Sequence, residues 1–303
     1  MGFGTLGPLA RFASEAGFTA VSFALWRAVS SVLALLVFLS IGTALRKVPI
    51  TRLSSIPRTE WLQLVVMGGF VAGTTISLFY AFERTTIAAA LIVFYTFPAW
   101  VAIAAVPLFG EHLGLRKLGA IALSGLGLVM LVAAPADGPA GIDLLGVGLA
   151  LAASLCQTGF ALVGAGGFRS VPPLQSAALL RLFSVAIYGV VLVPLMIALG
   201  QGRTVIDPVD SADAWVLILM AGVVGAAIPA VLIIAGYRRL GPTRGAVLML
   251  VEPVTGVLLA ALLLAEQPTP VQLAGGVLVL VGAALVQLTP VSRSGAIVGP
   301  TAE

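Results

Sequence analysis

Arg84-Thr-Thr-Ile-Ala-Ala-Ala-Leu-Ile-Val-Phe-Tyr-Thr-Phe-Pro98 opens an apolar stretch that runs on to Glu111. The same pattern returns 155 residues later, from Arg239 through Pro253 to Glu266. The match continues without a gap, and its further pairs are Leu118 and Leu273, Leu123 and Leu278, and Gly127 and Gly282. Each copy is long and apolar enough to cross a bilayer. The chain is therefore predicted to use one membrane-spanning unit twice.

The composition places most of the chain in lipid. Of its 303 residues, 60% are hydrophobic and only 9% are charged, and the mean hydropathy is +1.14, whereas soluble domains carry about 25% charged residues. Apolar stretches of about 20 residues match the length that a helix needs to cross ~30 Å of hydrocarbon. Alternating segments of about ten residues, as in a membrane β-barrel, are not evident. The fold class predicted is an all-α polytopic membrane protein.

Residue counts disfavour several kinds of chemistry. Cys156 is the only cysteine, which excludes an intramolecular disulfide and a cysteine metal cluster, and His112 is the only histidine. The net charge of +4 comes from basic residues in short loops between spans, so it does not indicate nucleic-acid binding. We therefore expect no metal, no cofactor and no nucleic-acid partner. The expected partners are the lipid bilayer and a small-molecule substrate.

Nine full spans are predicted. A shift of 154 residues pairs Arg27 with Arg181 and also puts Met1 on Leu155, partway along the sixth helix. The first helix is therefore predicted to be truncated by about a dozen residues at its front, because the start was assigned late or because the protein begins with a half-helix. The predicted spans are 19–41, 60–82, 86–109, 115–134, 142–165, 174–199, 213–236, 243–264 and 270–289.

These spans divide into two five-helix repeats, residues 1–134 and 142–289, followed by a tail at 290–303. Because each repeat has an odd number of helices, the second must enter the membrane from the opposite side, which predicts an inverted repeat. With a cytoplasmic N-terminus, only Arg84 and Arg203 fall in outer loops, so the termini are predicted to be cytoplasmic. The inner loops would hold Arg46, Lys47, Arg52, Arg58, Arg116, Lys117, Arg169, Arg238, Arg239, Arg244 and Arg293.

Glu252 is the most informative ionisable residue, because it lies about ten residues into a predicted span. A charge at that depth is costly and needs a reason. Pro253 follows it, and a proline frees a backbone carbonyl one turn earlier. A carboxyl removed from water can take up a proton reversibly, so Glu252 is a candidate for proton coupling or for binding a substrate amine. The alternative is a structural hydrogen bond or ion pair with a neighbouring helix.

Arg27 and Arg181 are related by the repeat and lie eight or nine residues inside their spans. Their guanidinium groups could face a central cavity and bind an anionic group such as a carboxylate. The alternative is that they reach the lipid headgroups or form structural ion pairs.

Pro98 is predicted to break the fourth helix at the position that matches Pro253. Tyr95, Phe97 and Trp100 surround it and could line a pocket for an amphipathic molecule or a cation. They could equally face lipid.

Charged residues at the helix ends receive structural interpretations. Glu111 and Glu266 are expected to be solvated helix ends or contacts between repeats. Glu83 and Arg84 are expected to pair locally in a short outer loop, and Arg11 and Glu15 are spaced as an i, i+4 pair. Small residues in the fifth and tenth helices predict close helix contact, within one chain or across a homodimer; they are Gly119, Gly125, Gly127, Gly275, Gly276 and Gly282.

The residues resemble those of the drug/metabolite transporter superfamily, specifically proteins with two EamA domains. The matching features are Ala24-Leu-Trp-Arg27, Gly241-Pro-Thr-Arg244, and a glutamate thirteen residues after Phe97-Pro98 and after Glu252-Pro253. The resemblance implies ten helices around a central cavity formed by the first four of each half, with the fifth and tenth outside it. Members of that superfamily move amino acids, other metabolites or drugs, commonly outward and without ATP.

The leading hypothesis is a secondary transporter in the plasma membrane that exports small metabolites such as amino acids by alternating access. A non-transporting regulatory or assembly subunit is an alternative that the short first helix suggests. A membrane-embedded enzyme acting on lipid is disfavoured, because one histidine and scattered carboxylates do not make a catalytic cluster.

Overall fold

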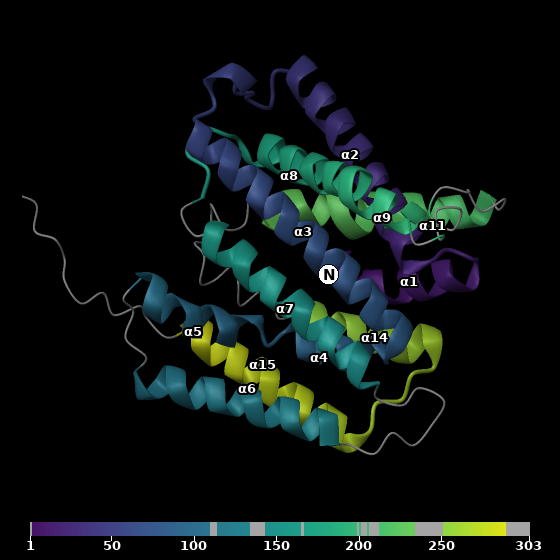
Figure 1. Ribbon diagram of the computed structural model, residues 1–303, viewed down its shortest axis with the longest axis vertical. Coiled ribbons are helices and arrows are strands. Elements are labelled where there is room, and N and C mark those ends of the chain that lie inside the picture. Colours follow the sequence, from purple (N-terminus) through teal and green to yellow (C-terminus); the bar gives the residue numbers. More distant parts are fainter. Residues whose placement is uncertain are drawn as a thin grey trace, which may run out of the picture.

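The computed structural model describes residues 2–109, 114–133, 143–164, 167–198, 200, 205, 212–233 and 251–288, and within these ranges it contains helices and no strand (Figure 1). The elements are η1 (Gly2–Thr5), α1 (Leu6–Glu15), α2 (Ala20–Ala44), η2 (Leu53–Ser55), α3 (Arg58–Arg84), α4 (Ile87–Phe94), α5 (Phe97–Phe109), α6 (Leu115–Ala133), α7 (Leu144–Gly164), α8 (Pro173–Ile187), η3 (Tyr188–Leu192), α9 (Val193–Ala198), α11 (Ala212–Gly222), η4 (Val223–Ala227), α14 (Val251–Leu264) and α15 (Pro270–Leu288).

Many of these helices are long and apolar enough to cross a membrane. Seven described segments qualify: Ala20–Ala44, Arg58–Arg84, Ile87–Leu108, Leu144–Gly164, Pro173–Ala198, Ala212–Ile233 and Pro270–Leu288. Large apolar side chains such as Leu262 and Val190 point outward, 79% and 75% exposed. A surface of this kind is suited to lipid rather than to water. The prediction of an all-α polytopic membrane protein is therefore confirmed.

Helices α6 and α15 show how the two halves are related. They pack side by side, and a Cβ on Gly127 would strike the backbone of Gly275 (Figure 1). Likewise, a Cβ on Gly282 would strike Ser124 and lie 2.6 Å from the carbonyl oxygen of Ala120. Gly127 matches Gly282, and Ala120 matches Gly275, under the repeat shift of 155 residues. Numbers rise along α6 as they fall along α15, so equivalent helices run antiparallel and the repeat is inverted.

The second and third helices of each half are related by the same two-fold symmetry. Gly222 of α11 lies against the turn of α2 that contains Arg27 and Ser30. Its repeat partner, Gly68 of α3, lies against α8, and the hydroxyl of Ser184 donates a 3.1 Å hydrogen bond to its carbonyl oxygen. Each half therefore packs its second helix onto the third helix of the other half.

The predicted break in the fourth helix is present. Helix α4 ends at Phe94, and α5 begins at Phe97 after a turn at Tyr95 and Thr96. Pro98 has no N–H to continue the helix across this turn. The Thr96 hydroxyl donates a 2.7 Å bond to the carbonyl oxygen of Val93 and contacts Ser154 of α7 at 3.1 Å, which fixes the turn. Pro253 lies in the first described turn of α14, and residues 234–250 lie outside the described part of the chain.

The end of the bundle where α3 finishes is called here the Arg84 end. The expectation that Glu83 and Arg84 pair with each other in a loop is wrong, because both lie in the last turn of α3. Arg84 lies 3.9 Å from Asp143, and Glu83 accepts a 2.6 Å hydrogen bond from the backbone N–H of Ala20. The first turn of α2 offers unpaired N–H groups, so it attracts the Glu83 carboxylate more strongly than an exposed neighbouring arginine does.

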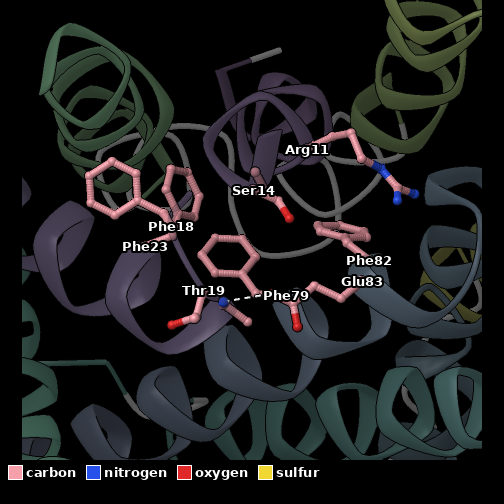
Figure 2. Close-up of a pocket in the computed structure, with 10 residues that line it drawn as sticks. Arg11, Ser14, Phe18, Thr19, Phe23, Phe79, Phe82 and Glu83 are labelled. Atoms are coloured by element: carbon pink, nitrogen blue, oxygen red, sulfur yellow. Dashed lines mark hydrogen bonds between the residues drawn. The ribbon is translucent and has the colours of Figure 1, made fainter. Parts of the chain in front are cut away.

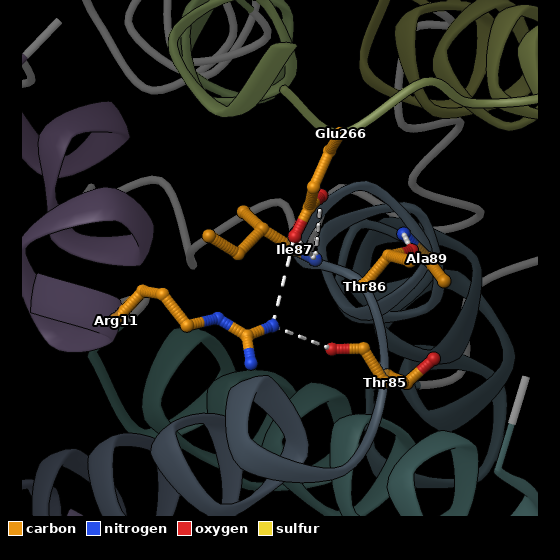
Figure 3. A network of polar contacts seen from close by, with 6 residues as sticks. All are labelled: Arg11, Thr85, Thr86, Ile87, Ala89 and Glu266. Atoms are coloured by element: carbon orange, nitrogen blue, oxygen red, sulfur yellow. Dashed lines mark hydrogen bonds and ion pairs between the residues drawn. The ribbon is translucent and has the colours of Figure 1, made fainter. Parts of the chain in front are cut away.

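Arg11 and Glu266 also meet at the Arg84 end, 3.6 Å apart (Figure 3). Arg11 therefore pairs with the second repeat rather than with Glu15 on its own helix face. The Glu266 carboxylate accepts hydrogen bonds of 3.2 and 3.1 Å from the backbone N–H of Ile87 at the start of α4. For Glu266, the predicted contact between repeats is confirmed; Glu111 lies outside the described residues.

The opposite end of the bundle is called the Arg58 end. There the segment before α3 meets the segment before α8. The backbone N–H of Thr51 donates a 2.9 Å hydrogen bond to the Gln175 side chain, which returns a 2.8 Å bond to the carbonyl oxygen of Thr51. Glu60 accepts a 3.2 Å bond from the N–H of Arg169. The two halves are thus joined by polar contacts at both ends.

Candidate functional site

A cavity between the halves brings together five of the six predicted site residues. It encloses about 1140 Å³ including its open mouth, and its lining includes Arg27, Tyr95, Phe97, Arg181 and Glu252. No described residue of α6 or α15 lines it, in agreement with the expected place of the fifth and tenth helices.

Helix α2 holds Arg27 in the cavity wall, where it is only 2% exposed. Its Nη2 donates a weak, 3.5 Å hydrogen bond to the Thr75 hydroxyl, and its guanidinium carbon lies 5.0 Å from the centre of the Phe79 ring. Its Nε and Nη1 atoms are buried and have no hydrogen-bond partner within the described part of the chain. Buried charged groups are normally fully hydrogen-bonded, so this guanidinium has unused capacity to bind an anion.

Arg181 occupies the equivalent place on α8 and is 8% exposed. It lines the same cavity as Arg27, and the two cations act on each other electrostatically. Among the described residues, no carboxylate lies within ion-pair distance of either arginine. Two like charges without a counter-ion make this part of the cavity electropositive.

Glu252 lies in the first turn of α14 and supplies a carboxyl to the cavity. The Tyr95 hydroxyl hydrogen-bonds this carboxyl. Tyr95 is in turn held by the break between α4 and α5, where it is 1% exposed and packs edge-on against Phe94 at 5.2 Å. The break between α4 and α5 and the first described turn of α14 therefore meet at one polar contact.

The rest of the cavity wall is mostly apolar and aromatic. Phe79, Phe82, Phe94 and Phe160 line it alongside Phe97. Such walls bind the apolar body of a ligand, while a few polar groups orient it.

Trp100 is the predicted site residue that does not line the cavity. Its indole N–H donates a 3.2 Å hydrogen bond to the hydroxyl of Thr96, so it supports the turn that carries Tyr95. Three polar cavity residues were not predicted: Thr74, Thr75 and Gln157. A polar side chain in the middle of an apolar span is a usable sequence signal, and Gln157 within α7 is the plainest instance.

An antiparallel pair of helical repeats around an internal cavity is the arrangement that inverted-repeat transporters have. The chain belongs to the EamA-like transporter family: the family model matches residues 1–133 and again residues 144–288. This match confirms the resemblance to transporters with two EamA domains.

A solved crystal structure of another protein shares this fold. It aligns with a TM-score of 0.57 and 20% sequence identity over 94% of each chain. No curated protein matches the chain.

Proposed function

We propose that this protein is a secondary active transporter that exports small metabolites, such as amino acids, across the plasma membrane by alternating access. The observation that carries the proposal is the cavity between the inverted halves, with Arg27, Arg181 and Glu252 in its wall. Inverted-repeat transporters bind their substrates at such an interface and rock one half against the other.

Arg27 and Arg181 are the proposed contacts for an anionic group of the substrate. A buried charge without a partner costs several kcal/mol, and a bound carboxylate recovers much of that cost through charge-assisted hydrogen bonds. The buried Nε and Nη1 of Arg27, which have no hydrogen-bond partner among the described residues, support this role, because each can donate to an oxygen of the substrate.

Glu252 is the proposed proton carrier. A carboxyl that is enclosed by apolar groups and touched by one hydroxyl can exist in either protonation state, and its charge alters the binding of an anion nearby. Release of a proton from Glu252 would add a negative charge to a cavity that holds the substrate anion and would weaken the binding of that anion. Proton and substrate anion would then favour the same state of the cavity, which is the basis of coupling between their movements.

The proposed orientation puts both termini in the cytoplasm. Basic residues are concentrated near the Arg58 end, at Arg46, Lys47, Arg52, Arg58 and Arg169. The positive-inside rule supports placing that end in the cytoplasm. The Arg84 end then faces outward.

The test is a flux measurement with purified protein in liposomes under an imposed pH gradient, across a panel of amino acids and small organic anions. We expect at least one compound to move against its gradient and to stabilise the protein thermally. Absence of both flux and ligand-dependent stabilisation across the panel would contradict the proposal and favour a non-transporting subunit.

A further inference from the structure

A second, smaller cavity, of about 300 Å³ including its open mouth, lies at the Arg84 end, between α1, α2 and α3 (Figure 2). Ser14 and Glu83 are exposed at its rim. Buried aromatic residues close its inner side, and they are Phe18, Phe23, Phe79 and Phe82. The cavity thus has a wet polar mouth and an apolar floor.

Phe79 and Phe82 line both the smaller cavity and the central cavity. The side chains of these two phenylalanines therefore form part of the wall between the cavities. Phe79 packs against Phe23 at 5.0 Å between ring centres and against Phe82 at 6.1 Å. A phenyl ring has no hydrogen-bonding group, so turning these rings breaks no hydrogen bond.

Arg27 touches this wall from the central cavity, because its guanidinium lies 5.0 Å from the centre of the Phe79 ring. A cation over an aromatic face is attracted to it and so holds the ring in place. An anion that binds the guanidinium competes for the same charge and weakens its attraction to the ring. Substrate binding and the position of Phe79 are therefore linked through Arg27.

We propose that the smaller cavity is the outer vestibule of the transport path and that Phe79 and Phe82 are the gate between it and the central cavity. The vestibule would admit water from the Arg84 end while the phenyl rings keep the central cavity closed. The inference rests on the proposed function in so far as it describes a transport path. Whether the wall between the two cavities is closed can be tested without any substrate.

The experiment uses the full-length protein with Cys156→Ala, which removes the only native cysteine. Ser14→Cys then reports on the vestibule, and Thr74→Cys, in a separate protein, reports on the central cavity. A membrane-impermeant thiol reagent is applied to one side of oriented vesicles at a time. We expect Ser14→Cys to react rapidly from the Arg84 side, and Thr74→Cys to react at least tenfold more slowly from that side.

Adding Phe79→Ala and Phe82→Ala is expected to remove this tenfold difference. Phe79→Leu, a gentler change, should remove part of it and guards against misfolding of the double variant. Phe160→Ala is the matched control, since Phe160 lines the central cavity but not the vestibule. It should leave the reaction of Thr74→Cys from the Arg84 side unchanged.

The proposed gate would be rejected if the labelling rate of Thr74→Cys from the Arg84 side stayed the same after both phenyl rings are removed. It would also be rejected if Phe160→Ala raised that rate by an equal amount. Labelling requires no transport, so the two proposals fail separately. Loss of the labelling pattern with normal flux would reject only the gate. The expected pattern without any flux would reject only the transport function.

Discussion

Arg27 is deeply buried and has unused hydrogen-bonding capacity. Its replacement should therefore not lower the stability of the protein, but should lower its affinity for an anionic substrate. Replacement by glutamine removes a buried charge without a carboxylate partner in the described structure, so the protein should become no less stable. A charge-assisted hydrogen bond contributes about 1.5–3 kcal/mol, so affinity for an anionic substrate should fall roughly tenfold to a hundredfold. Thermal unfolding and concentration-dependent flux measure the two effects.

The matched control for Arg27→Gln is Arg84→Gln, because Arg84 is exposed and lies outside the cavity. It should leave affinity within twofold of the original protein. A clear loss of stability in Arg27→Gln would show instead that Arg27 has a structural role.

Glu252 gives the second residue-scale prediction. Glutamine has nearly the same shape but cannot exchange a proton, so Glu252→Gln should lose the dependence of transport on the pH gradient while still binding substrate. Flux measured across a series of imposed pH gradients checks this. Glu15→Gln, at an exposed position that lines neither cavity, should keep the original profile, and a preserved profile in Glu252→Gln would remove its proposed proton role.

At the scale of elements, the α6–α15 contact allows a comparison along one helix. Gly127 meets the backbone of α15, whereas Gly125 has open space where a Cβ would lie. Gly127→Ala should lower the free energy of unfolding by about 1–3 kcal/mol, because α15 must move away. Gly125→Ala should raise it by up to about 1 kcal/mol through helix propensity. Unfolding in detergent, followed by circular dichroism, measures both; equal effects would contradict the close contact.

The glycines also show what the sequence could predict about the elements. The repeat matches Gly127 with Gly282, and both lie in the tight α6–α15 contact, so close packing of these helices was predicted correctly. Gly119 and Gly125 share the same helix but face open space. In a span that is apolar on every side, composition does not show which side faces a neighbour. Trp100 was a candidate to line the cavity but does not line it. The turn after Phe94 changes the direction in which the residues of α5 point, and composition does not show that change.

At the scale of the whole molecule, the contact of Arg11 with Glu266 could not be predicted, because it joins the two ends of the chain through tertiary structure. In the described structure the two residues differ in exposure and in the second group that each contacts, and this predicts unequal effects on the free energy of unfolding. Arg11 is 32% exposed, so Arg11→Gln should cost less than about 1 kcal/mol. Glu266 is 11% exposed and also binds the N-terminus of α4, so Glu266→Gln should cost about 1–2 kcal/mol.

A double-mutant cycle on thermal unfolding separates these contributions. The coupling between the two residues should be smaller than the whole effect of Glu266→Gln. If the coupling equals that whole effect, the α4 N-terminus contributes nothing and the proposed inequality is wrong.

The exchange of partners between the halves has a consequence for biosynthesis. Arg27 is made early, but the helix that covers its turn contains Gly222 and is made much later. At about 5–20 residues per second, translation of the intervening chain takes roughly 10–40 s. During that interval α2 must reside in or beside the membrane without the helix that packs on its Ser30 side, although α3 already supplies the contacts of the Arg27 guanidinium. Newly made chains therefore pass through a stage in which the insertion machinery, rather than the protein itself, must cover that side of α2.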